Sequence, residues 1–346
     1  MCGNDAMSES AILAGCRYYF GYPITPQNEV AAYMAMRMPQ VGGTFIQAES
    51  EVAAINMVFG AAAVGVRAMT SSSSPGISLK QEGISYLCGC ELPAVIANVV
   101  RGGPGLGSIG PSQADYFQAT RGGGHGDYRT IALAPSTVQE LVDLTFLSFE
   151  LADKYRNPVL ILSDGILGQM MEPVVLPDPT DGDLPPKDWA LTGAKNRPPN
   201  VIKSLFLDVD LLEQLNVKLQ EKYRRMTQEE TRLEEVRMDD ADIVLVAYGS
   251  VARICRGAVR RLREAGERVG LLRPITVWPF PGEALARAAE TARLFLAVEM
   301  SMGQLVEDVR LALDGRAPVR FYGRAGGCVM TVEDVVKEIR KIRSEM

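Results

Sequence analysis

Three stretches of the sequence place side chains with useful chemistry at turns. Thr25 stands between two prolines in "GYPITPQNEV", Glu49 and Glu51 open the small-residue stretch "QAESEVAAINMVFGAAAVG", and Arg101 begins the glycine-rich "RGGPGLGSIG". A hydroxyl and a guanidinium together can hold a carboxylate or a phosphate, and a glutamate can exchange a proton. These residue types predict an anion-binding site beside an acid–base group.

Each of these residues also has a structural interpretation. An acid in the first turn of a helix stabilises it by about 0.3–1 kcal/mol, which accounts for Glu49 and competes evenly with a functional role at Glu51. A structural ion pair would account for Arg101, and His125 in "GGGHGDY" fits a structural loop histidine. The small residues after Glu51 favour the functional interpretation, because they let a flat ring or another backbone approach closely.

Metal chemistry has little support in the composition. The chain has one histidine and six cysteines without a C-x-x-C spacing, which predicts no metal site and reduced, buried thiols. If the protein is an enzyme, a cofactor is expected to carry its chemistry.

The elements that position these residues follow an α/β pattern. Apolar runs predict strands in "CRYYFG", "GGTFIQ", "VRAMTSSSS", "LPAVIANVV", "YRTIALA" and "NPVLILSDG", and helical spacing covers 26–37, 49–65, 76–89 and 136–154. Continuous apolar strands are typical of a parallel sheet with helices on both faces. Since ligands bind at the carboxyl ends of such strands, the turns that carry Thr25, Glu51 and Arg101 should meet at one edge.

Three regions are predicted along the chain: a first domain over 1–170, a linker region over 171–240 and a second α/β domain over 241–346. Residues 172–200 contain seven prolines and predict an extended linker, and 208–237 predict a long charged helix. In the second domain, strands are expected in "ADIVLVAYGS", "RVGLLRP", "LFLAVEM" and "VRFYG", with helices over 251–265, 283–293, 303–314 and 331–344.

The composition of the chain argues against a nucleic-acid-binding, membrane-spanning or secreted protein. The 346 residues carry a net charge of −6 without a basic stripe, which argues against nucleic acid as a partner. No apolar run is long enough for a membrane span, and the N-terminus lacks the pattern of a secretory signal. We therefore expect a cytoplasmic protein.

The longest motifs resemble the α subunit of 2-oxoacid:ferredoxin oxidoreductases. They are "FGYPITPQNEV", "QAESEVAAINMVFGAA", "TSSSSPGISLKQEGISY", "VVRGGPGLGSIGPSQADYFQATRGGGHGDYR", "LLRPITVWPFP" and "VEMSMGQLVEDVR". The glycine-rich motif is most similar to the branched-chain (2-oxoisovalerate) type, with the 2-oxoglutarate type next. The resemblance implies the pyrimidine-binding domain of thiamine diphosphate enzymes, followed by a smaller transketolase-C-like α/β domain.

The resemblance also implies roles for individual residues. Glu51 is expected to contact N1′ of the aminopyrimidine of thiamine diphosphate and to favour its imino tautomer, which makes it the catalytic residue. Thr25 and Arg101 are expected to hold the substrate carboxylate. The remaining implied positions are Tyr22, Pro23 and Ser74 for cofactor binding, with Gln113 and His125 as further site candidates.

Other parts of such an enzyme are missing from this sequence. The diphosphate of the cofactor needs Mg²⁺, and "TDGDLPPKDW" lacks the strand-to-helix context of a Gly-Asp-Gly motif. The resemblance therefore implies a β subunit for the diphosphate and Mg²⁺, a γ subunit, a ferredoxin-like subunit with 4Fe–4S clusters, ferredoxin as acceptor and coenzyme A as co-substrate.

The expected activity is the oxidative decarboxylation of a 2-oxo acid to acyl-CoA by a hetero-oligomer of anaerobic metabolism. Two alternatives of another class stay open here. A nucleotide-binding dehydrogenase would use the glycines after Arg101, although no helix or distant acid with the required spacing follows them. A non-catalytic scaffold subunit would retain the motifs without using Glu51.

Overall fold

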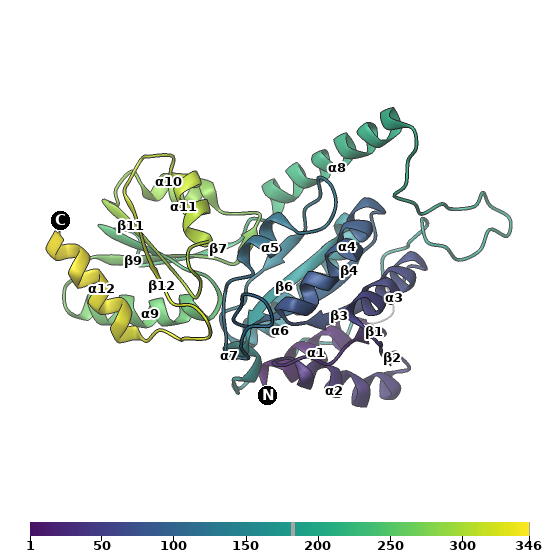
Figure 1. Cartoon of the computed structure of the whole chain (residues 1–346), viewed down its shortest axis with the longest axis horizontal. Helices are drawn as coiled ribbons and strands as arrows, with labels where there is room; N and C mark the ends of the chain where they lie inside the picture. The colour runs from purple at the N-terminus through teal and green to yellow at the C-terminus, as the bar shows by residue number, and fades with distance from the viewer. Residues whose placement is uncertain (181–183, 346) are drawn as a thin grey trace.

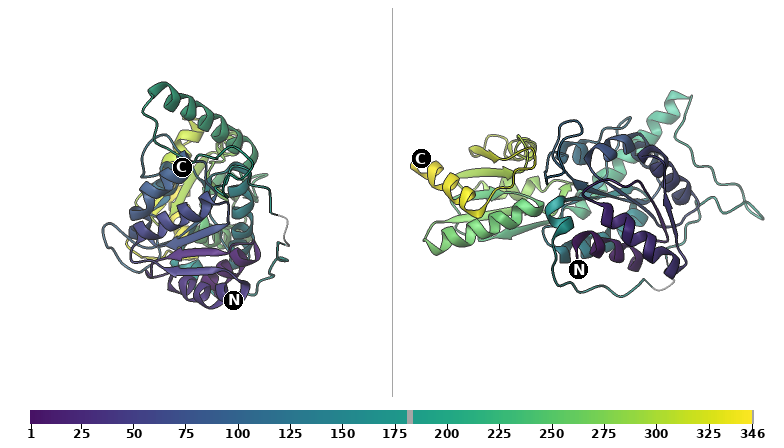
Figure 2. Two further views of the ribbon diagram at one scale, coloured as in Figure 1. Left: turned by 90° about the vertical axis from the view of Figure 1, so that its right-hand side faces the viewer. Right: turned by 60° about the horizontal axis from the view of Figure 1, so that its bottom comes forward.

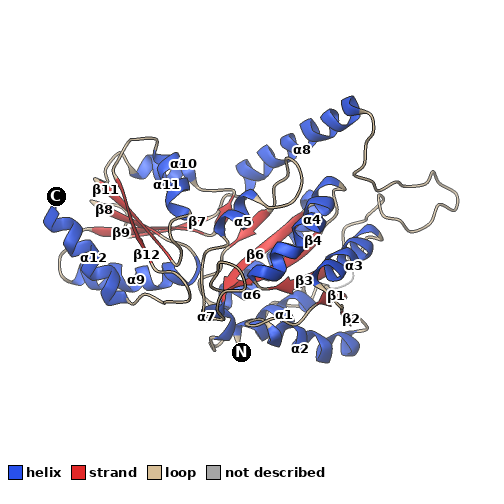
Figure 3. Ribbon diagram, in the orientation of Figure 1, coloured by secondary structure: helices blue, strands red, loops and turns tan. Residues whose placement is uncertain are grey.

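The computed structural model describes residues 1–180 and 184–345, in which two α/β units lie side by side (Figures 1 and 3). The residues "DGD" (181–183) of "TDGDLPPKDW" fall outside the described residues. The N-terminal unit contains α1 (Gly3–Leu13), β1 (Tyr18–Gly21), α2 (Asn28–Arg37), the 3₁₀ helix η1 (Met38–Val41), β2 (Thr44–Gln47), α3 (Glu51–Ala63), β3 (Ala68–Ser72), α4 (Ser74–Gly89), β4 (Ala94–Val100), α5 (Tyr116–Arg121), β5 (Ile131–Leu133), α6 (Val138–Tyr155), β6 (Pro158–Asp164) and α7 (Gly165–Gln169).

The second unit follows the long helix α8 (Val209–Glu230). It contains β7 (Leu233–Val236), β8 (Ile243–Val246), α9 (Gly249–Glu264), β9 (Val269–Pro274), β10 (Thr276–Trp278), α10 (Gly282–Ala288), β11 (Leu294–Glu299), α11 (Leu305–Leu313), β12 (Val319–Gly323) and α12 (Val332–Glu345). None of the helices within 1–180 and 184–345 is both long enough and apolar enough to cross a membrane.

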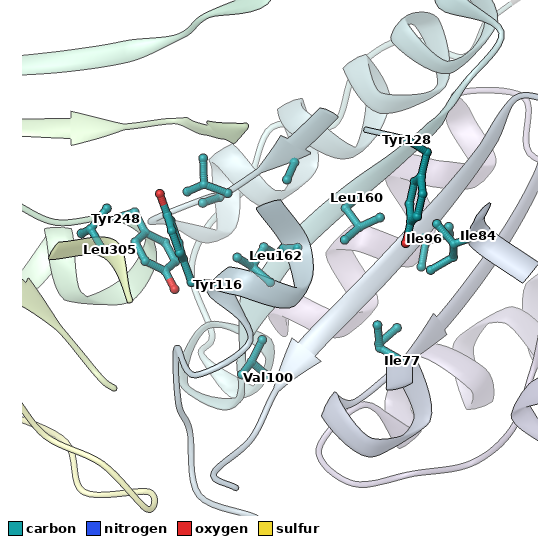
Figure 4. Packing of buried hydrophobic residues seen from close by; sticks show 14 of the residues in the cluster. Ile77, Ile84, Ile96, Val100, Tyr116, Tyr128, Leu160, Leu162, Tyr248 and Leu305 are labelled. Carbon is teal, nitrogen blue, oxygen red and sulfur yellow. The ribbon is translucent and has the colours of Figure 1, made fainter. Parts of the chain in front are cut away.

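The first sheet has the strand order β10-β5-β6-β4-β3-β1-β2, and β1 to β6 are all parallel. Strands β3, β4 and β6 are buried at every residue, because helices cover both faces of the sheet. Helices α1, α2 and α6 pack on one face, and α3 and α4 pack on the other. Figure 4 shows Ile77 and Ile84 of α4 against Ile96 and Leu160 of the sheet. The parallel sheet with helices on both faces confirms the predicted fold class.

The second sheet has the order β12-β11-β8-β9-β7 and is parallel except for β7, which runs antiparallel to β9. Helices α9 and α12 cover one face, and α10 and α11 cover the other. The side chains of β8 and β9 supply both cores, since neighbouring side chains of a strand point to opposite faces. This unit is the smaller α/β domain that the sequence predicted.

One local prediction was wrong, and one strand pairing was not foreseen. The helix expected over 208–237 ends at Glu230, and 233–236 form β7 instead, because this segment pairs with β9 and Glu234 meets the buried Arg273. The strand β10 belongs to the second region of the sequence, yet it pairs antiparallel with β5 and extends the first sheet. The two units are therefore joined by a shared sheet edge.

The segment between α7 and α8 first runs along the surface of the first unit, and its later part, before α8, extends away from that unit as a long loop (Figures 1 and 2). Its backbone bonds to the end of α1 through Thr180 and to the end of α3 through Leu191, at N–O distances of 2.8 and 2.9 Å. All six cysteines are free; four are buried, Cys2 is half-buried and Cys328 is exposed, so the prediction of buried thiols was wrong for these two.

Candidate functional site

The turns singled out in the sequence meet at one edge of the first sheet. In the parallel register, Gly21 at the end of β1 lies beside Gln47 at the end of β2, and Ser72 at the end of β3 lies beside Asn98 near the end of β4. The segments that follow these strands carry Thr25, Glu51 and Arg101 on the same side. Such an edge is where ligands bind in open α/β sheets.

Glu51 is the first residue of α3, and its side chain is buried, with 4% exposed. Ser50 caps the helix by accepting the N–H of Ala53 at 3.1 Å, so the backbone of Glu51 is fixed. The hydroxyl of Ser72 donates to Glu51 Oε1 at 2.5 Å, and the ammonium of Lys80 donates to Glu51 Oε2. A carboxylate oxygen has two acceptor sites, so each oxygen can still accept a further bond.

Gly76 gives this carboxylate its space. A Cβ on Gly76 would lie 2.2 Å from Glu51 Oε1 and 2.0 Å from Ser72 Oγ, which real side chains do not tolerate. The first turn of α4 can therefore lie against the carboxylate because residue 76 has no side chain. Lys80 and Gly76 were not among the predicted site residues, although the spacing G-x-x-x-K at the start of a helix places both on one face.

The serine run at the end of β3 contacts Glu51, Arg101 and the segment that follows Thr25. Ser71 donates to Gln27, which follows the turn of Thr25, at 2.5 Å. Ser72 donates to Glu51, and Ser74 both accepts the backbone N–H of Arg101 at 3.0 Å and lies 3.2 Å from its carbonyl. The predicted candidate Ser74 thus fixes the backbone of Arg101. The run "SSSS" (71–74) could have indicated these contacts in the sequence, because it places small hydroxyl side chains on both faces of a strand end.

Arg101 and Thr25 lie in contact. The Arg101 side chain is buried, and its Nη1 and Nη2 donate to the carbonyls of Thr25 and Leu106 at 2.9 and 3.1 Å. Its Nε has no hydrogen-bond partner among residues 1–180 and 184–345. A buried guanidinium with an unsatisfied N–H is suited to an anionic ligand. Thr25 itself is exposed, and its hydroxyl accepts from Asn28 at 3.3 Å.

The surroundings of this edge are open and partly apolar. Tyr22 and Pro23 are both exposed after β1. A cavity of about 320 Å³ beside Thr25 is lined by Pro26, Asn28, Glu29, Ile109, Pro111, Gly165, Ile166 and Gln169. The elements around Glu51 also carry exposed large apolar side chains, namely Ile46, Val52 and Leu79. Large exposed apolar side chains on the elements next to a buried carboxylate are suited to a covering partner.

Gln113 lies at the contact of the two units. Its side chain accepts from Met300 N at 3.0 Å and donates to the carbonyl of Tyr248 at 2.8 Å, while Tyr248 donates its hydroxyl back to the Gln113 carbonyl. Tyr116 packs on Tyr248 with ring centroids 5.5 Å apart (Figure 4). The hydrogen bonds of Gln113 in this structure are those of a residue that joins the two units.

His125 is exposed and lies at a different place. It lines a cavity of about 590 Å³ together with Tyr86 of α4, Phe206 and residues of α8 such as Leu215. Thr25, Glu51 and Arg101 do not line this cavity. The structure therefore brings together Thr25, Glu51, Ser74 and Arg101, with Tyr22 and Pro23 beside them, and places His125 at another cavity, while the side chain of Gln113 is engaged between the two units.

The residues at the edge fit the pyrimidine half of thiamine diphosphate. Glu51 offers a buried carboxylate with acceptor sites to spare, and Gly76 leaves it room. Within the described part of the chain, no group of three or more histidine, cysteine or acidic side chains is arranged to hold a metal ion.

Two protein-family models together match most of the chain. Residues 9–237 match the model of the pyruvate flavodoxin/ferredoxin oxidoreductase thiamine diphosphate-binding domain, and residues 241–335 match core domain II of pyruvate:ferredoxin oxidoreductase. The chain therefore belongs to the 2-oxoacid:ferredoxin oxidoreductase family, which confirms the resemblance seen in the motifs.

The sequence identity to individual relatives differs between the substrate types of the family. The chain is 53% identical over 343 residues to the ketoisovalerate oxidoreductase subunit VorB of Methanothermobacter thermautotrophicus, covering 99% of this chain and 97% of the relative. It is 37% identical to the 2-oxoglutarate synthase subunit KorA of the same organism, covering 98% and 97% of the two chains. The similarity is thus higher to the branched-chain type than to this 2-oxoglutarate subunit.

Solved structures agree with the fold. The 2-oxoglutarate:ferredoxin oxidoreductase of Magnetococcus marinus, solved with 2-oxoglutarate, coenzyme A and succinyl-CoA bound, superposes with a TM-score of 0.86 at 29% identity. The match covers 99% of this chain and 64% of that chain, so this chain spans somewhat less than two thirds of its length. A split-gene transketolase superposes with a TM-score of 0.63 at 16% identity over 99% and 97% of the two chains, which shows a shared fold.

Proposed function

We propose that this chain is the pyrimidine-binding subunit of a 2-oxoacid:ferredoxin oxidoreductase that converts a branched-chain 2-oxo acid and coenzyme A to acyl-CoA and carbon dioxide. The two electrons released pass to ferredoxin. The near-full-length identity of 53% to a ketoisovalerate oxidoreductase subunit carries this proposal. The geometry of the sheet edge supports the roles of individual residues.

Glu51 is the proton-exchanging group. A buried carboxylate beside the cofactor ring would hold a proton at N1′, and Ser72 orients Oε1 for this task through a 2.5 Å hydrogen bond. When bound, thiamine diphosphate supplies the ring that accepts the electron pair left by decarboxylation. We propose Tyr22, Pro23 and Ser74, which lie at the same edge of the sheet, as further cofactor-binding residues.

Arg101 and Thr25 hold the substrate carboxylate. The unsatisfied Nε of Arg101 would supply a charge-assisted donor, and the hydroxyl of Thr25, whose carbonyl accepts from the same guanidinium, would supply a second donor. The carbonyls of Thr25 and Leu106 fix the guanidinium in advance, so little side-chain entropy is lost on binding.

Partner subunits complete the enzyme. We propose that a β subunit binds the diphosphate and Mg²⁺ and covers the apolar side chains around Glu51, while a γ subunit and a ferredoxin-like subunit with 4Fe–4S clusters carry the electrons. The exposed Ile46, Val52 and Leu79 support a covering subunit at this edge.

The substrate is tested with the purified complex. Initial rates of ferredoxin reduction are measured with 2-oxoisovalerate, 2-oxoglutarate, pyruvate and indolepyruvate, each with coenzyme A. The highest kcat/KM is expected for 2-oxoisovalerate. A higher value for 2-oxoglutarate would reassign the chain to the 2-oxoglutarate type, whose subunits are also close relatives.

Residue roles are tested with matched variants. Glu51→Gln should abolish turnover, while Glu49→Gln, which changes an exposed acid two residues away, should not. Arg101→Met should raise KM, whereas Arg17→Met should leave it unchanged, because Arg17 also donates to two carbonyls but lies at the start of β1. Full turnover of the Glu51→Gln complex would instead support a scaffold subunit.

A further inference from the structure

A buried lysine faces the carboxylate of Glu51. Lys80 lies in α4, its side chain is 0% exposed, and its ammonium contacts Glu51 Oε2 and lies 3.4 Å from the Glu51 carbonyl. Its neighbours on the same helix face are Gly76, which lies against Glu51, and Gly83, which lies against Ile55 of α3. The two glycines bring α3 and α4 close together, and Lys80 fills the space between them at the level of Glu51.

The positive charge of Lys80 is paired with the carboxylate of Glu51. Burial lowers the pKa of Lys80, and the charge and hydrogen bond of Glu51 oppose that shift. Tyr19 of β1, whose hydroxyl bonds to Ser71, also senses the charge of Glu51: burial is the main cause that raises the pKa of Tyr19, and the Glu51 charge adds to it. Among the described residues, Lys80 forms an ion pair with Glu51 alone.

Stability by itself does not account for this pair. Replacing a buried ion pair with apolar residues of similar volume is often neutral or stabilising, because both charges must lose their hydration. A lysine is rarely buried so completely. A role in the chemistry of Glu51 accounts for its place better, because an opposite charge within about 4 Å favours the ionised form of a carboxylate.

We infer that Lys80 is a positioning residue that holds Glu51 ionised and fixes its Oε2, so that the proton shared between Glu51 and the cofactor lies on the ring nitrogen. Ser72 and Lys80 then hold one carboxylate oxygen each, and the carboxylate cannot rotate without breaking both contacts. This inference rests on the proposed role of Glu51. Glu51 held in this way would keep a proton on the ring nitrogen of bound thiamine diphosphate, which would make the amino group of that ring more acidic.

Lys80→Met tests the inference, and Lys222→Met is its matched control. Lys222 is also a largely buried lysine paired with a glutamate, Glu91, and burial also lowers its pKa, but it lies in α8. Methionine keeps much of the length and the apolar stem of lysine in both places. Each variant is studied as the complete complex with its partner subunits.

The first measurement needs no cofactor. Infrared difference spectra of the complex without thiamine diphosphate report whether Glu51 is protonated, with Glu51→Gln to assign the band. At pH 7 a protonated carboxyl band should appear in Lys80→Met and be absent from the wild type and from Lys222→Met. Absence of that band from Lys80→Met would overturn the inference.

The second measurement follows deuterium exchange at C2 of bound thiamine diphosphate by quenched-flow NMR. Lys80→Met should slow the exchange at least about tenfold, the effect of one unit of proton affinity, and should slow it no further when Glu51→Gln is already present. A wild-type rate in Lys80→Met, or an equal loss in Lys222→Met, would overturn the inference. A wild-type rate in Glu51→Gln would instead overturn the proposed function, while the infrared band would still report on Lys80.

Discussion

Gly76→Ala is the sharpest test of the way α4 packs against Glu51. The added Cβ would lie 2.2 Å from Glu51 Oε1 and 2.0 Å from Ser72 Oγ, and the carboxylate would have to withdraw by ~1 Å to reach ordinary contact. That movement breaks the hydrogen bond from Ser72 and weakens the contact with Lys80. The backbone conformation of Gly76 has no positive φ, so the steric contact is the cause of any effect.

The expected magnitude follows from the two contacts. Overpacking costs about 1–3 kcal/mol, and a buried acceptor that loses its donor costs about 1–3 kcal/mol. Alanine in a helix recovers at most about 1 kcal/mol relative to glycine. We expect Gly76→Ala to lower the free energy of unfolding by about 2–4 kcal/mol and to abolish most of the activity of the complex.

Two other helical glycines are the controls. Gly60 of α3 is exposed, and no atom lies within 4 Å of the position that a Cβ would take there, so Gly60→Ala should stabilise the fold by about 0.5–1 kcal/mol. Gly83→Ala would place Cβ 2.6 Å from Ile55 Cγ2, an apolar atom, and should destabilise without moving the carboxylate. Urea unfolding and C2 deuterium exchange are measured for all three. The reasoning is refuted if Gly76→Ala unfolds at the wild-type midpoint with wild-type exchange, or if Gly83→Ala slows exchange as strongly.

Three further outcomes follow from contacts elsewhere. Arg273→Met should lower the free energy of unfolding by about 3 kcal/mol, because it leaves Glu140 without its buried partner at the contact of the two units. The control is Arg256→Met, which changes an exposed arginine and should alter the free energy of unfolding by less than about 1 kcal/mol. Equal urea midpoints for the two variants would contradict this expectation. Thr137→Ala should cost about 1 kcal/mol by removing the cap of α6, and an unshifted thermal midpoint would argue against it. Burial raises the pKa of Asp164, so folding favours the protonated carboxyl, and the stability that Asp164 contributes falls as the pH rises above 3.8, the ordinary pKa of an aspartate. Asp164→Asn should make the urea midpoint fall less steeply with rising pH. The same slope in the variant and the wild type would show this expectation to be wrong.

The sequence predicted the arrangement of the first sheet from local features. Apolar runs that end in turns identify β1 to β6, and the ends of parallel strands must share one edge whatever the details of packing. That rule alone brings Thr25 and Arg101 together. Their contact in the structure, through Arg101 Nη1 and the Thr25 carbonyl, is the outcome that the rule predicts.

The errors have a physical cause in long-range pairing. The segment 231–237 has the composition of a charged helix, and it becomes β7 because β9 offers an edge to pair with and Arg273 offers a partner for Glu234. Strand β10 joins the first sheet for the same reason, since β5 leaves that edge free. Pairing between segments so far apart in the chain has no signal in local periodicity.

The sequence by itself determined the fold class, the family and the three residues at the sheet edge, because strand ends and motifs are local properties of the chain. Only the tertiary structure decided that Lys80 is buried against Glu51, that Gln113 joins the two units, and that His125 lies at another cavity. A lysine in a helix is expected at the surface. Its burial here depends on two glycines that let α3 approach α4, and that distance is set by packing between helices.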